Sequence, residues 1–347
     1  MKSSIRSTAE LARRLGVSRW TVSRALNGHA GVNADTVARI TKTARQLGFA
    51  PSMLGRGLRS GRTDQVGICL PDLVDYFLTA KIMRLQQTLQ QQALHPLLQI
   101  IDNTVETENA ALERFAAMRC ASVIGIASRL DEKSPGVRSL ASAGIPFIRI
   151  DPLNVAGGFS VSTDRRTATR EALIHLHQLG HRRLIAIGFS PDTSYGRQRL
   201  DGLRAGCRTA GWNFRSDISL WELPEAPDDF SAGAALAEIY LKNRRSVHAI
   251  LALNDRVAMG LMRNLQAHGV VIPDEVSLIG YDNTEFCPHA APALTSIDPQ
   301  VDLLIEQAVK MLAKPDLHSL KKPFFLKPLL VIRDSTASPP KARRGKK

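Results

Sequence analysis

Residues 7–27 constrain this chain more than any other stretch, because they predict two short helices joined by a glycine turn. Ser7 and Glu10 have the spacing of a capping box, in which each side chain satisfies a free backbone NH at the start of a helix. Apolar residues then repeat at helical spacing as far as Gly16, a residue that ends a helix at little conformational cost. Ser18 is placed to cap the second helix. The stretch therefore predicts a helix-turn-helix.

The second helix of this pair has a polar and basic outer face. Val22 and Leu26 point toward the first helix. The outward-facing residues are Arg19, Trp20, Ser23 and Arg24. An ordinary helical hairpin with a solvated charged face is the alternative. The cap, the turn and the basic face together favour a second helix that reads the major groove of DNA.

The net charge of the chain, +14 at pH 7, is concentrated at its two ends. Residues 1–60 hold eleven lysines and arginines against two acidic residues, and residues 337–347 hold five basic residues and no acidic one. Residues 61–336 are therefore neutral. A basic head on a neutral body indicates that the head binds a polyanion.

Length and composition limit the class of protein. A chain of 347 residues that is 44% hydrophobic can bury more than one core, so two or three domains are expected. No apolar run reaches the length of a membrane span and no signal-peptide hydrophobic region is seen, so no membrane partner and a cytoplasmic location are expected. The four cysteines are far apart in the sequence, which favours buried free thiols over disulfides or a metal site.

From residue 65 onward, short apolar segments alternate with helical patterns. Strands are expected at 66–70, 97–101, 122–127, 146–150, 184–188, 218–221, 249–253, 276–280, 294–297 and 324–332. Helices are expected near 77–93, 106–118, 131–143, 164–179, 195–210, 230–243, 255–268 and 299–313. Fully apolar strands separated by helices predict parallel sheets that are covered on both faces. The expected fold is a small all-α head followed by an α/β core of two doubly wound subdomains, the chain returning to the first near residue 295.

The head resembles the DNA-binding domain of the lactose-repressor (LacI/GalR) family of transcriptional regulators. The residues that carry the resemblance are Val17-Ser18, Thr21-Val22-Ser23-Arg24, Leu26-Asn27, Val32 and Gly48-Phe49-Ala50-Pro51. The two α/β halves resemble the periplasmic-binding-protein-like core of the same family, so the resemblance covers nearly the whole chain. It implies a homodimeric regulator, a repressor in its commonest form, whose affinity for an inverted-repeat operator is controlled by a small molecule between two lobes. A sugar is the expected effector, and the bound protein is expected at the bacterial nucleoid.

The resemblance also implies four parts. These are a helix-turn-helix domain at 1–51, a hinge at 52–62, an effector-binding and dimerisation domain at 63–336, and a basic disordered tail at 337–347. In the family the hinge becomes helical on DNA and inserts a leucine into the minor groove, and Leu58 falls at that position. A flexible tether is the alternative, because Gly55 and Gly57 each disfavour a helix by about 1 kcal/mol.

Residues of the head are assigned to bases or to phosphates. Arg19, Trp20 and Arg24 are expected to read base edges, because arginine pairs with guanine and tryptophan packs on thymine methyl groups. The residues that match family positions gripping phosphates are Ser7, Ser18, Thr21, Ser23, Asn27, His29 and Asn33. Asn33 is also placed to cap a third helix that completes the head.

The effector is expected in the cleft, at the carboxyl ends of strands. The family's effector contacts map onto Arg197, Asn254 and Asp282, with Phe230 near the stacking aromatic and Asp151 after the fourth strand. An arginine fork with Asn and Asp can bracket vicinal hydroxyls, while an aromatic ring covers the apolar face of a sugar. The alternative is that these side chains cap helices or bridge the lobes, a role expected for Asp164, Asp201 and Asp255.

No pattern of a catalytic site is present. The sequence has no G-x-S-x-G, no Walker A motif and no H-E-x-x-H, so no enzyme, catalytic residue or cofactor is expected. His175, His177 and His181 cluster, but Gly180 ends their helix before His181, so no metal site is expected. A sugar-binding or sugar-modifying protein without gene control remains the alternative function.

Overall fold

The computed structural model describes residues 7–26, 28, 30–49, 63–71, 76–102, 104–153, 159–243, 247–312 and 322–340. The chain divides into two units, Met1–Asp64 and Gln65–Lys347. The predicted hinge at 52–62 lies outside the described residues, and so do residues 341–347 of the predicted tail.

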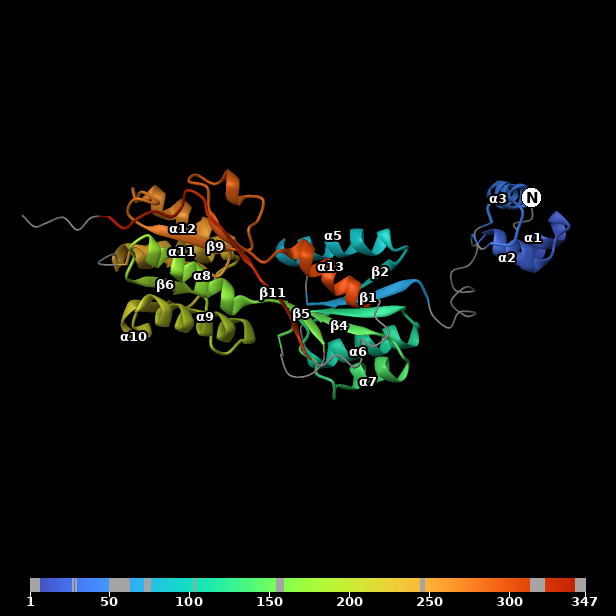
Figure 1. Cartoon of the computed structure of the whole chain (residues 1–347), viewed down its shortest axis with the longest axis horizontal. Coiled ribbons are helices and arrows are strands. Elements are labelled where there is room, and N and C mark those ends of the chain that lie inside the picture. The colour runs from blue at the N-terminus through green and yellow to red at the C-terminus, as the bar shows by residue number, and fades with distance from the viewer. Residues whose placement is uncertain are drawn as a thin grey trace, which may run out of the picture. The chain divides into compact units, whose positions relative to one another are not determined.

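The described part of the first unit is a bundle of three helices (Figure 1). They are α1 (Thr8–Leu15), α2 (Arg19–Leu26) and α3 (Ala34–Gln46). The Ser7 hydroxyl caps α1 by accepting from the Glu10 NH at 3.2 Å, and Gly16 ends it with φ of 67°. The buried core consists of Leu11, Ala12, Val22, Ala25, Ile40 and Ala44. The predicted helix-turn-helix with a third closing helix is confirmed.

The second unit contains two six-stranded sheets, and the first of them with its helices is called the first lobe (Figure 1). Its strand order is β11-β5-β4-β3-β1-β2, all parallel. The strands are β1 (Gln65–Leu70), β2 (His95–Ile100), β3 (Ser122–Ile126), β4 (Phe147–Ile150), β5 (Ser160–Thr163) and β11 (Phe324–Leu326). One face is covered by α5 (Tyr76–Gln91) and α13 (Val301–Leu312), the other by α6 (Val105–Ala117) and α7 (Pro135–Ser142).

The second lobe has the strand order β12-β10-β9-β8-β6-β7, and only β12 runs antiparallel to its neighbour. Its strands are β6 (Leu184–Ile187), β7 (Ile218–Trp221), β8 (Ala249–Leu251), β9 (Ser277–Tyr281), β10 (Thr295–Asp298) and β12 (Leu329–Val331). One face is covered by α8 (Arg165–Gln178) and α9 (Ser194–Ala210), the other by α11 (Asp229–Lys242) and α12 (Asp255–Ala267). Two short turns complete the lobe, α10 (Phe214–Asp217) and η1 (Cys287–His289). The predicted doubly wound core is confirmed.

Three segments connect the lobes, and hydrogen bonds tie them to one another. They run from β5 to α8, from β10 to α13 and from β11 to β12. The Asp164 NH donates to the Leu326 carbonyl at 2.9 Å, and the Thr163 hydroxyl donates to the Pro299 carbonyl at 3.4 Å. The Gln300 side-chain amide donates to the Lys327 carbonyl. These hydrogen bonds join the three crossover segments into one connected region between the lobes.

Two sequence predictions about this region are wrong. Residues 324–332 form two strands, β11 and β12, that belong to different sheets, because the chain crosses between lobes at Lys327 and Pro328. The strand predicted at 294–297 is β10 of the second lobe, so the chain returns to the first lobe only after Asp298. Strand β5 was not predicted at all.

The first residue of the predicted tail, Ala337, is hydrogen-bonded to the second lobe. The Ala337 NH donates to the Ser277 hydroxyl at 3.0 Å, and the Ala337 carbonyl lies 2.9 Å from His181 Nε2. These bonds are made by the backbone, so the polar composition of the segment gives no sign of them. The disordered tail predicted from residue 337 is therefore wrong for Ala337.

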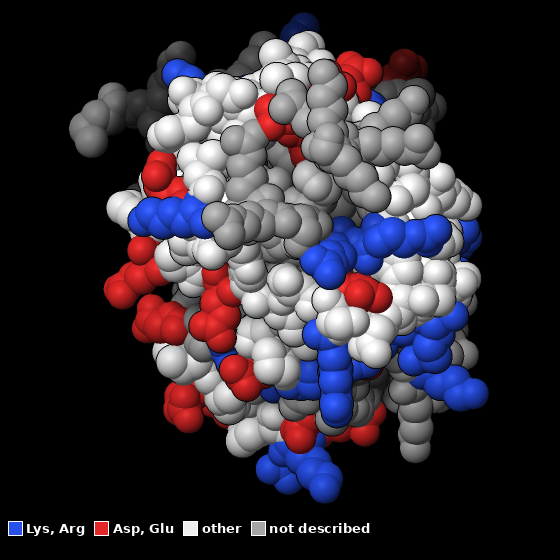
Figure 2. All heavy atoms as spheres, turned by 90° about the vertical axis from the view of Figure 1, so that its left-hand side faces the viewer, with Lys and Arg blue, Asp and Glu red and all other residues white. Residues whose placement is uncertain are grey.

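Charge and cysteine placement in the core follow the sequence. Figure 2 shows basic and acidic side chains interspersed on one end of the core, in keeping with the neutral balance of residues 61–336. All four cysteines are buried and free, as predicted. No helix in the described part of the chain is long and apolar enough to cross a bilayer.

Candidate DNA interface and ligand site

The three predicted base-reading residues on the outer face of α2 differ in the contacts that they make. Trp20 is 60% exposed and unobstructed, and the Arg24 guanidinium lies 4.8 Å from its ring centroid. Arg24 also donates from Nε to the Ala30 carbonyl at 2.7 Å and from Nη2 to the same atom. Arg19 makes a longer bond, 3.3 Å from Nε to the Thr8 hydroxyl. Arg24 therefore holds the turn between α2 and α3 and must leave Ala30 to reach a base.

Three of the predicted phosphate contacts cap helices. Ser7 caps α1, and the Ser18 hydroxyl accepts from the Thr21 NH at 3.0 Å at the start of α2. The Asn33 side chain accepts from the Asp35 NH at 2.8 Å at the start of α3. The amino ends of helices carry partial positive charge and free NH groups, which suits them to phosphate. Asn27, His29 and Leu58 lie outside the described residues.

The five predicted effector contacts do not line one cavity. Asp282 lines a hollow of about 350 Å³, Arg197 one of about 580 Å³ and Phe230 one of about 620 Å³. Asn254 caps α12 by accepting from the Val257 NH at 2.9 Å, and it donates to Asp229 at 2.8 Å. Asp151 is buried in ion pairs. Of the five, Asp282 alone lines the hollow formed by α5, the end of β9 and the start of α13.

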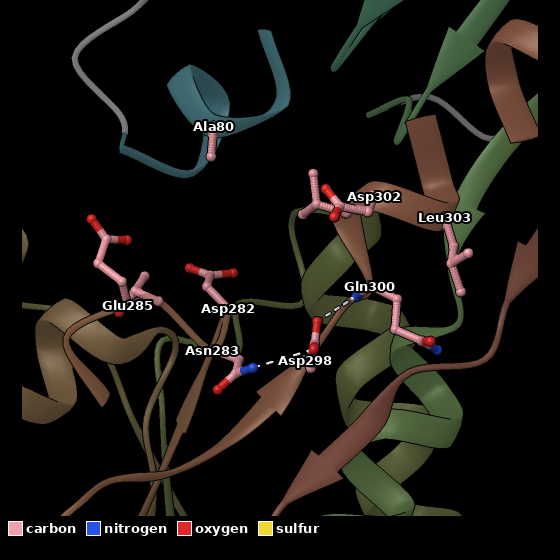
Figure 3. Close-up of a pocket in the computed structure, with 10 residues that line it drawn as sticks. Ala80, Asp282, Asn283, Glu285, Asp298, Gln300, Asp302 and Leu303 are labelled. Carbon is pink, nitrogen blue, oxygen red and sulfur yellow. Dashed lines mark hydrogen bonds between the residues drawn. The ribbon is translucent and has the colours of Figure 1, made fainter. Parts of the chain in front are cut away.

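The hollow around Asp282, called the interlobe hollow, joins both lobes (Figure 3). It is lined by Ala80 of α5, by residues 282–285 after β9, and by Asp298 and residues 300–303 at the start of α13. Asp282 has φ of 105° and Asn283 has φ of 48°, a left-handed conformation that costs a residue with a side chain roughly 1–3 kcal/mol. Asn283 is held by Asp298 at 3.2 Å, and Figure 3 shows the carboxylates of Asp282 and Glu285 directed toward Ala80.

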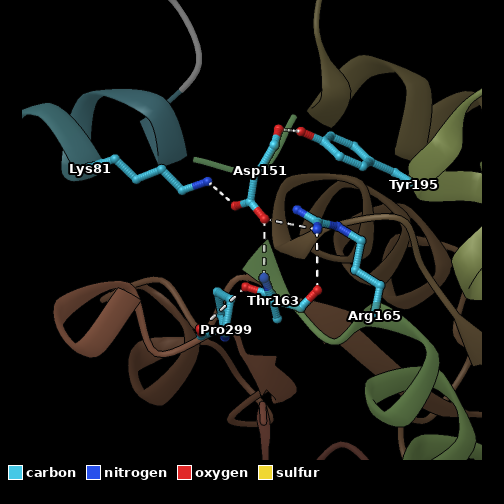
Figure 4. A network of polar contacts seen from close by, with 6 residues as sticks. All are labelled: Lys81, Asp151, Thr163, Arg165, Tyr195 and Pro299. Carbon is cyan, nitrogen blue, oxygen red and sulfur yellow. Dashed lines mark hydrogen bonds and ion pairs between the residues drawn. The ribbon is translucent and has the colours of Figure 1, made fainter. Parts of the chain in front are cut away.

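Asp151 is the centre of a buried ionic network that spans the lobes (Figure 4). Its carboxylate accepts from Lys81 Nζ of α5 at 2.6 Å and from Arg165 Nη1 of α8 at 2.9 Å. The Thr163 NH donates to the same carboxylate at 3.1 Å, and the Tyr195 hydroxyl of α9 donates to the Asp151 carbonyl. Asp151 therefore bridges the lobes, which was the alternative to an effector contact.

The charge balance of this network keeps Asp151 ionised. Burial opposes the charged carboxylate, but the positive charges of Arg165 and Lys81 outweigh it and hold the pKa of Asp151 well below its usual range. The same pairing raises the pKa of Arg165 despite its burial. The network is thus a fixed set of charges at physiological pH.

The sequence did not single out Arg199, which lies two residues after Arg197 on α9. The Arg199 guanidinium is buried between two aromatic rings, 4.5 Å from the centroid of Tyr281 and 5.4 Å from that of Phe189. Tyr281 ends β9 and Phe189 follows β6, so Arg199 lies at the carboxyl end of the second sheet. Burial lowers the pKa of Arg199, and the neighbouring Tyr281 counteracts it.

Several polar atoms around Arg199 are buried without a hydrogen-bond partner in the described part of the chain. They are Arg165 Nε, Ser194 Oγ, Arg199 Nε and the Tyr281 hydroxyl. An unpaired buried polar group costs about 1–3 kcal/mol, so such a group is a candidate for contact with a ligand. The spacing Arg197-x-Arg199 was the available signal, but residues two apart point to different sides of a helix and the sequence does not say which side is inside.

The remaining polar predictions are confirmed as structural. Asp164 caps α8, Asp201 pairs with Arg204 at 2.9 Å, and Asp255 accepts from Ser296 and from the Thr284 NH. The three clustered histidines each make a separate bond. Their partners are Thr336 for His175, Trp212 for His177, and Ser277 and Ala337 for His181.

Two known families match this chain. Residues 8–52 match the bacterial regulatory proteins of the lacI family, and residues 173–336 match the periplasmic binding protein-like domain. The HTH-type transcriptional regulator AscG of Escherichia coli (strain K12) is 25% identical over 336 residues, which cover 95% of this chain and 98% of AscG. The regulator reg1 of Streptomyces lividans is 28% identical over 347 residues, covering 96% of this chain and 98% of reg1.

Solved structures share the fold along nearly the whole chain. The lac repressor bound to ONPG in its repressed state has a TM-score of 0.82 at 23% identity, over 95% of this chain and 99% of that chain. The complex of the regulator CelR with cellobiose has a TM-score of 0.64 at 24% identity, over 95% of this chain and 100% of that chain. The similar proteins are transcriptional regulators rather than enzymes.

Proposed function

Because the chain belongs to the lacI family of bacterial regulatory proteins, we propose that it represses transcription as a homodimer bound to an inverted-repeat operator. The observation that carries this proposal is the outer face of α2, where Trp20 is 60% exposed on a folded and capped helix-turn-helix. A tryptophan on the outer face of the second helix of a helix-turn-helix can pack on the thymine methyl groups of the major groove. The basic charge of residues 1–60 gives that partner the chemistry of a polyanion.

We propose that a sugar bound at the interlobe hollow controls operator affinity. The lac repressor structure contains ONPG and the CelR structure contains cellobiose, which supports a sugar as the class of effector. Asp282 points into the hollow. It would accept a hydrogen bond from a hydroxyl group of the sugar, while Asp151 would join the two lobes.

Pairing of two cores places two heads on one operator. Met83 of α5 is 60% exposed, and the edge strand β2 exposes Leu98 and Ile100. Apolar side chains on a helix and an unpaired strand edge favour a protein partner, and a second copy of the chain supplies one. We propose that the dimer acts in the cytoplasm, and that the segment 52–62 links each core to its head.

The test is a gel shift with the full-length protein and the DNA upstream of its own gene, with and without a panel of sugars. We expect a salt-sensitive complex whose affinity one sugar changes at least fivefold, within the usual range of about 1–3 kcal/mol of coupling. Asp282→Asn should abolish the sugar effect and keep DNA binding. If no specific complex forms while a sugar raises the melting temperature, the protein is a sugar-binding protein without gene control.

A further inference from the structure

We infer that the hollow between α8, α9 and β11 is a second ligand site, which takes a small organic molecule carrying a phosphate or carboxylate group. This α8–α9 hollow has a volume of about 580 Å³ and shares no lining residue with the interlobe hollow. Its size is within the range of about 300–1,000 Å³ that small-molecule sites occupy. The lining residues are Asp164, Arg166, Ser194, Arg197, Gln198, Asp201 and Phe325.

The carboxylates of this hollow are already engaged. Asp164 accepts from the Thr167 NH at 2.9 Å and from the Thr167 hydroxyl at 2.6 Å. Asp201 pairs with Arg204 at 2.9 Å. Asp201 is thus paired with an arginine outside the hollow, whereas Asp164 keeps its charge, so the lining carries two arginine charges against one carboxylate without an arginine partner among the described residues.

The donors are placed to receive an anion. Arg166 is exposed and has no ion-pair partner in the part of the chain that the structure describes. Arg197 donates from Nη1 to the Pro191 and Asp192 carbonyls, which orients its guanidinium without neutralising its charge. Two arginines on one hollow match the oxygens of a phosphate or carboxylate, because each guanidinium can donate two parallel hydrogen bonds.

Ser194 gives an independent indication of a ligand. It lines the hollow, it is 5% exposed, and its hydroxyl has no hydrogen-bond partner among the described residues. It is also the first residue of α9, a helix of 17 residues with no acidic residue in its first turn. The amino end of this helix therefore adds uncompensated positive potential beside an unsatisfied hydroxyl.

The exposed ring of Phe325 favours a ligand that has an apolar organic part as well as its anionic group. Its ring is 45% exposed on β11, beside the arginines of the hollow. Water is a poor neighbour for that ring, whereas the apolar face of a sugar or of another flat molecule packs on it well. Phe325 belongs to the first sheet and the arginines belong to helices of the second lobe, so a ligand here contacts both lobes.

The test is isothermal titration of the full-length protein with glucose 6-phosphate, gluconate, glucose and inorganic phosphate. We expect glucose 6-phosphate or gluconate to bind with one site per chain, and the double variant Arg166→Gln/Arg197→Gln to weaken binding by about tenfold or more. Phe325→Ser should weaken the organic anion and leave inorganic phosphate unchanged. Arg170→Gln, an exposed arginine of α8 outside the hollow, is the matched control and should bind as the wild type does.

Three results would overturn the inference. They are no binding by either organic anion, unchanged binding by the double arginine variant, and inorganic phosphate binding as tightly as glucose 6-phosphate. The site itself does not depend on the proposed repressor function, because titration needs no DNA. Any effect of the ligand on operator affinity does rest on that function, and Asp282→Asn separates the two hollows by removing the sugar response alone.

Discussion

Replacing Asp151 by asparagine should destabilise the protein more than any other single exchange in the network between the lobes. The exchange keeps the shape of the side chain and removes its charge. Lys81 and Arg165, which are 2% and 5% exposed, then both lose the buried carboxylate that they share. Removing one partner of a buried ion pair costs about 3–5 kcal/mol, a large part of a total stability of about 5–15 kcal/mol.

Lys81→Met is the matched comparison for this prediction. It leaves Asp151 paired with Arg165 and with the Thr163 NH, so only one charged hydrogen bond is lost. Such a bond contributes about 1.5–3 kcal/mol. In the double variant the buried lysine charge is removed together with the carboxylate, so its loss should fall short of the sum of the two single losses by about 0.5–3 kcal/mol.

Urea unfolding of the full-length protein, followed by far-ultraviolet circular dichroism, measures these losses. The pH dependence supplies a second readout. Because the pKa of Asp151 is lowered in the folded state, its contribution is complete above the unfolded value of about 3.9 and is lost as the pH falls below it. The difference between wild type and Asp151→Asn should therefore be constant from about pH 5 to 8. The reasoning would be refuted if the free energy of unfolding of Asp151→Asn lay within about 1 kcal/mol of the wild-type value. It would also be refuted if Lys81→Met lost as much stability as Asp151→Asn.

Four further outcomes are expected. In a randomised operator library, Arg19→Ala should change which bases are preferred, whereas Asn33→Ala should weaken all sequences alike, since we expect Arg19 to contact bases and Asn33, which caps α3, to lie at a phosphate. Gly260→Ala should lower the urea midpoint through a loss of roughly 1–3 kcal/mol, because the new Cβ would lie 2.1 Å from the Phe230 carbonyl oxygen. Burial lowers the pKa of His181, so wild-type stability should fall as the pH drops below about 6.5, and His181→Gln should reduce that fall. Sedimentation at micromolar concentration should show a dimer, and a monomer there would contradict the proposed pairing of cores.

The strands were predictable where burial and hydrophobicity coincide. Strands such as β1 and β3 are buried through most of their length and are rich in branched apolar residues. Strand β5, Ser160–Thr163, is also buried at all four residues, yet three of them are Ser or Thr. The Thr163 hydroxyl bonds the crossover to the second lobe, where it donates to the Pro299 carbonyl. A propensity argument has no means of finding a strand whose polar residues are satisfied by a distant segment.

The sequence predicts where the candidate site lies but not which residues form it. The carboxyl ends of strands did supply Asp151 and Asp282, and both adopt left-handed conformations there. The choice between Arg197 and Arg199 depends on which side of α9 faces Tyr281 and Phe189, and that is a property of packing. The role of Asp151 depends on Lys81, which is 70 residues away in sequence. Such pairings become visible only when the two lobes are assembled.

The position of the ionic network explains how a ligand could act on a region it does not touch. Lys81 and Asp151 belong to the first lobe and Arg165 and Tyr195 to the second, so a change in the lobe arrangement must either keep the bonds from Asp151 to Arg165 and Tyr195 or break them together. Breaking a buried ionic bond costs several kcal/mol, so the lobes should occupy discrete arrangements rather than a continuum. A ligand then shifts the balance only by its difference in affinity for the two arrangements, and a shift from 1:99 to 99:1 requires about 5.5 kcal/mol. Removing one bond between the lobes by Tyr195→Phe lowers the energy that separates the arrangements, so the sugar should act at a different concentration in that variant than in the wild type.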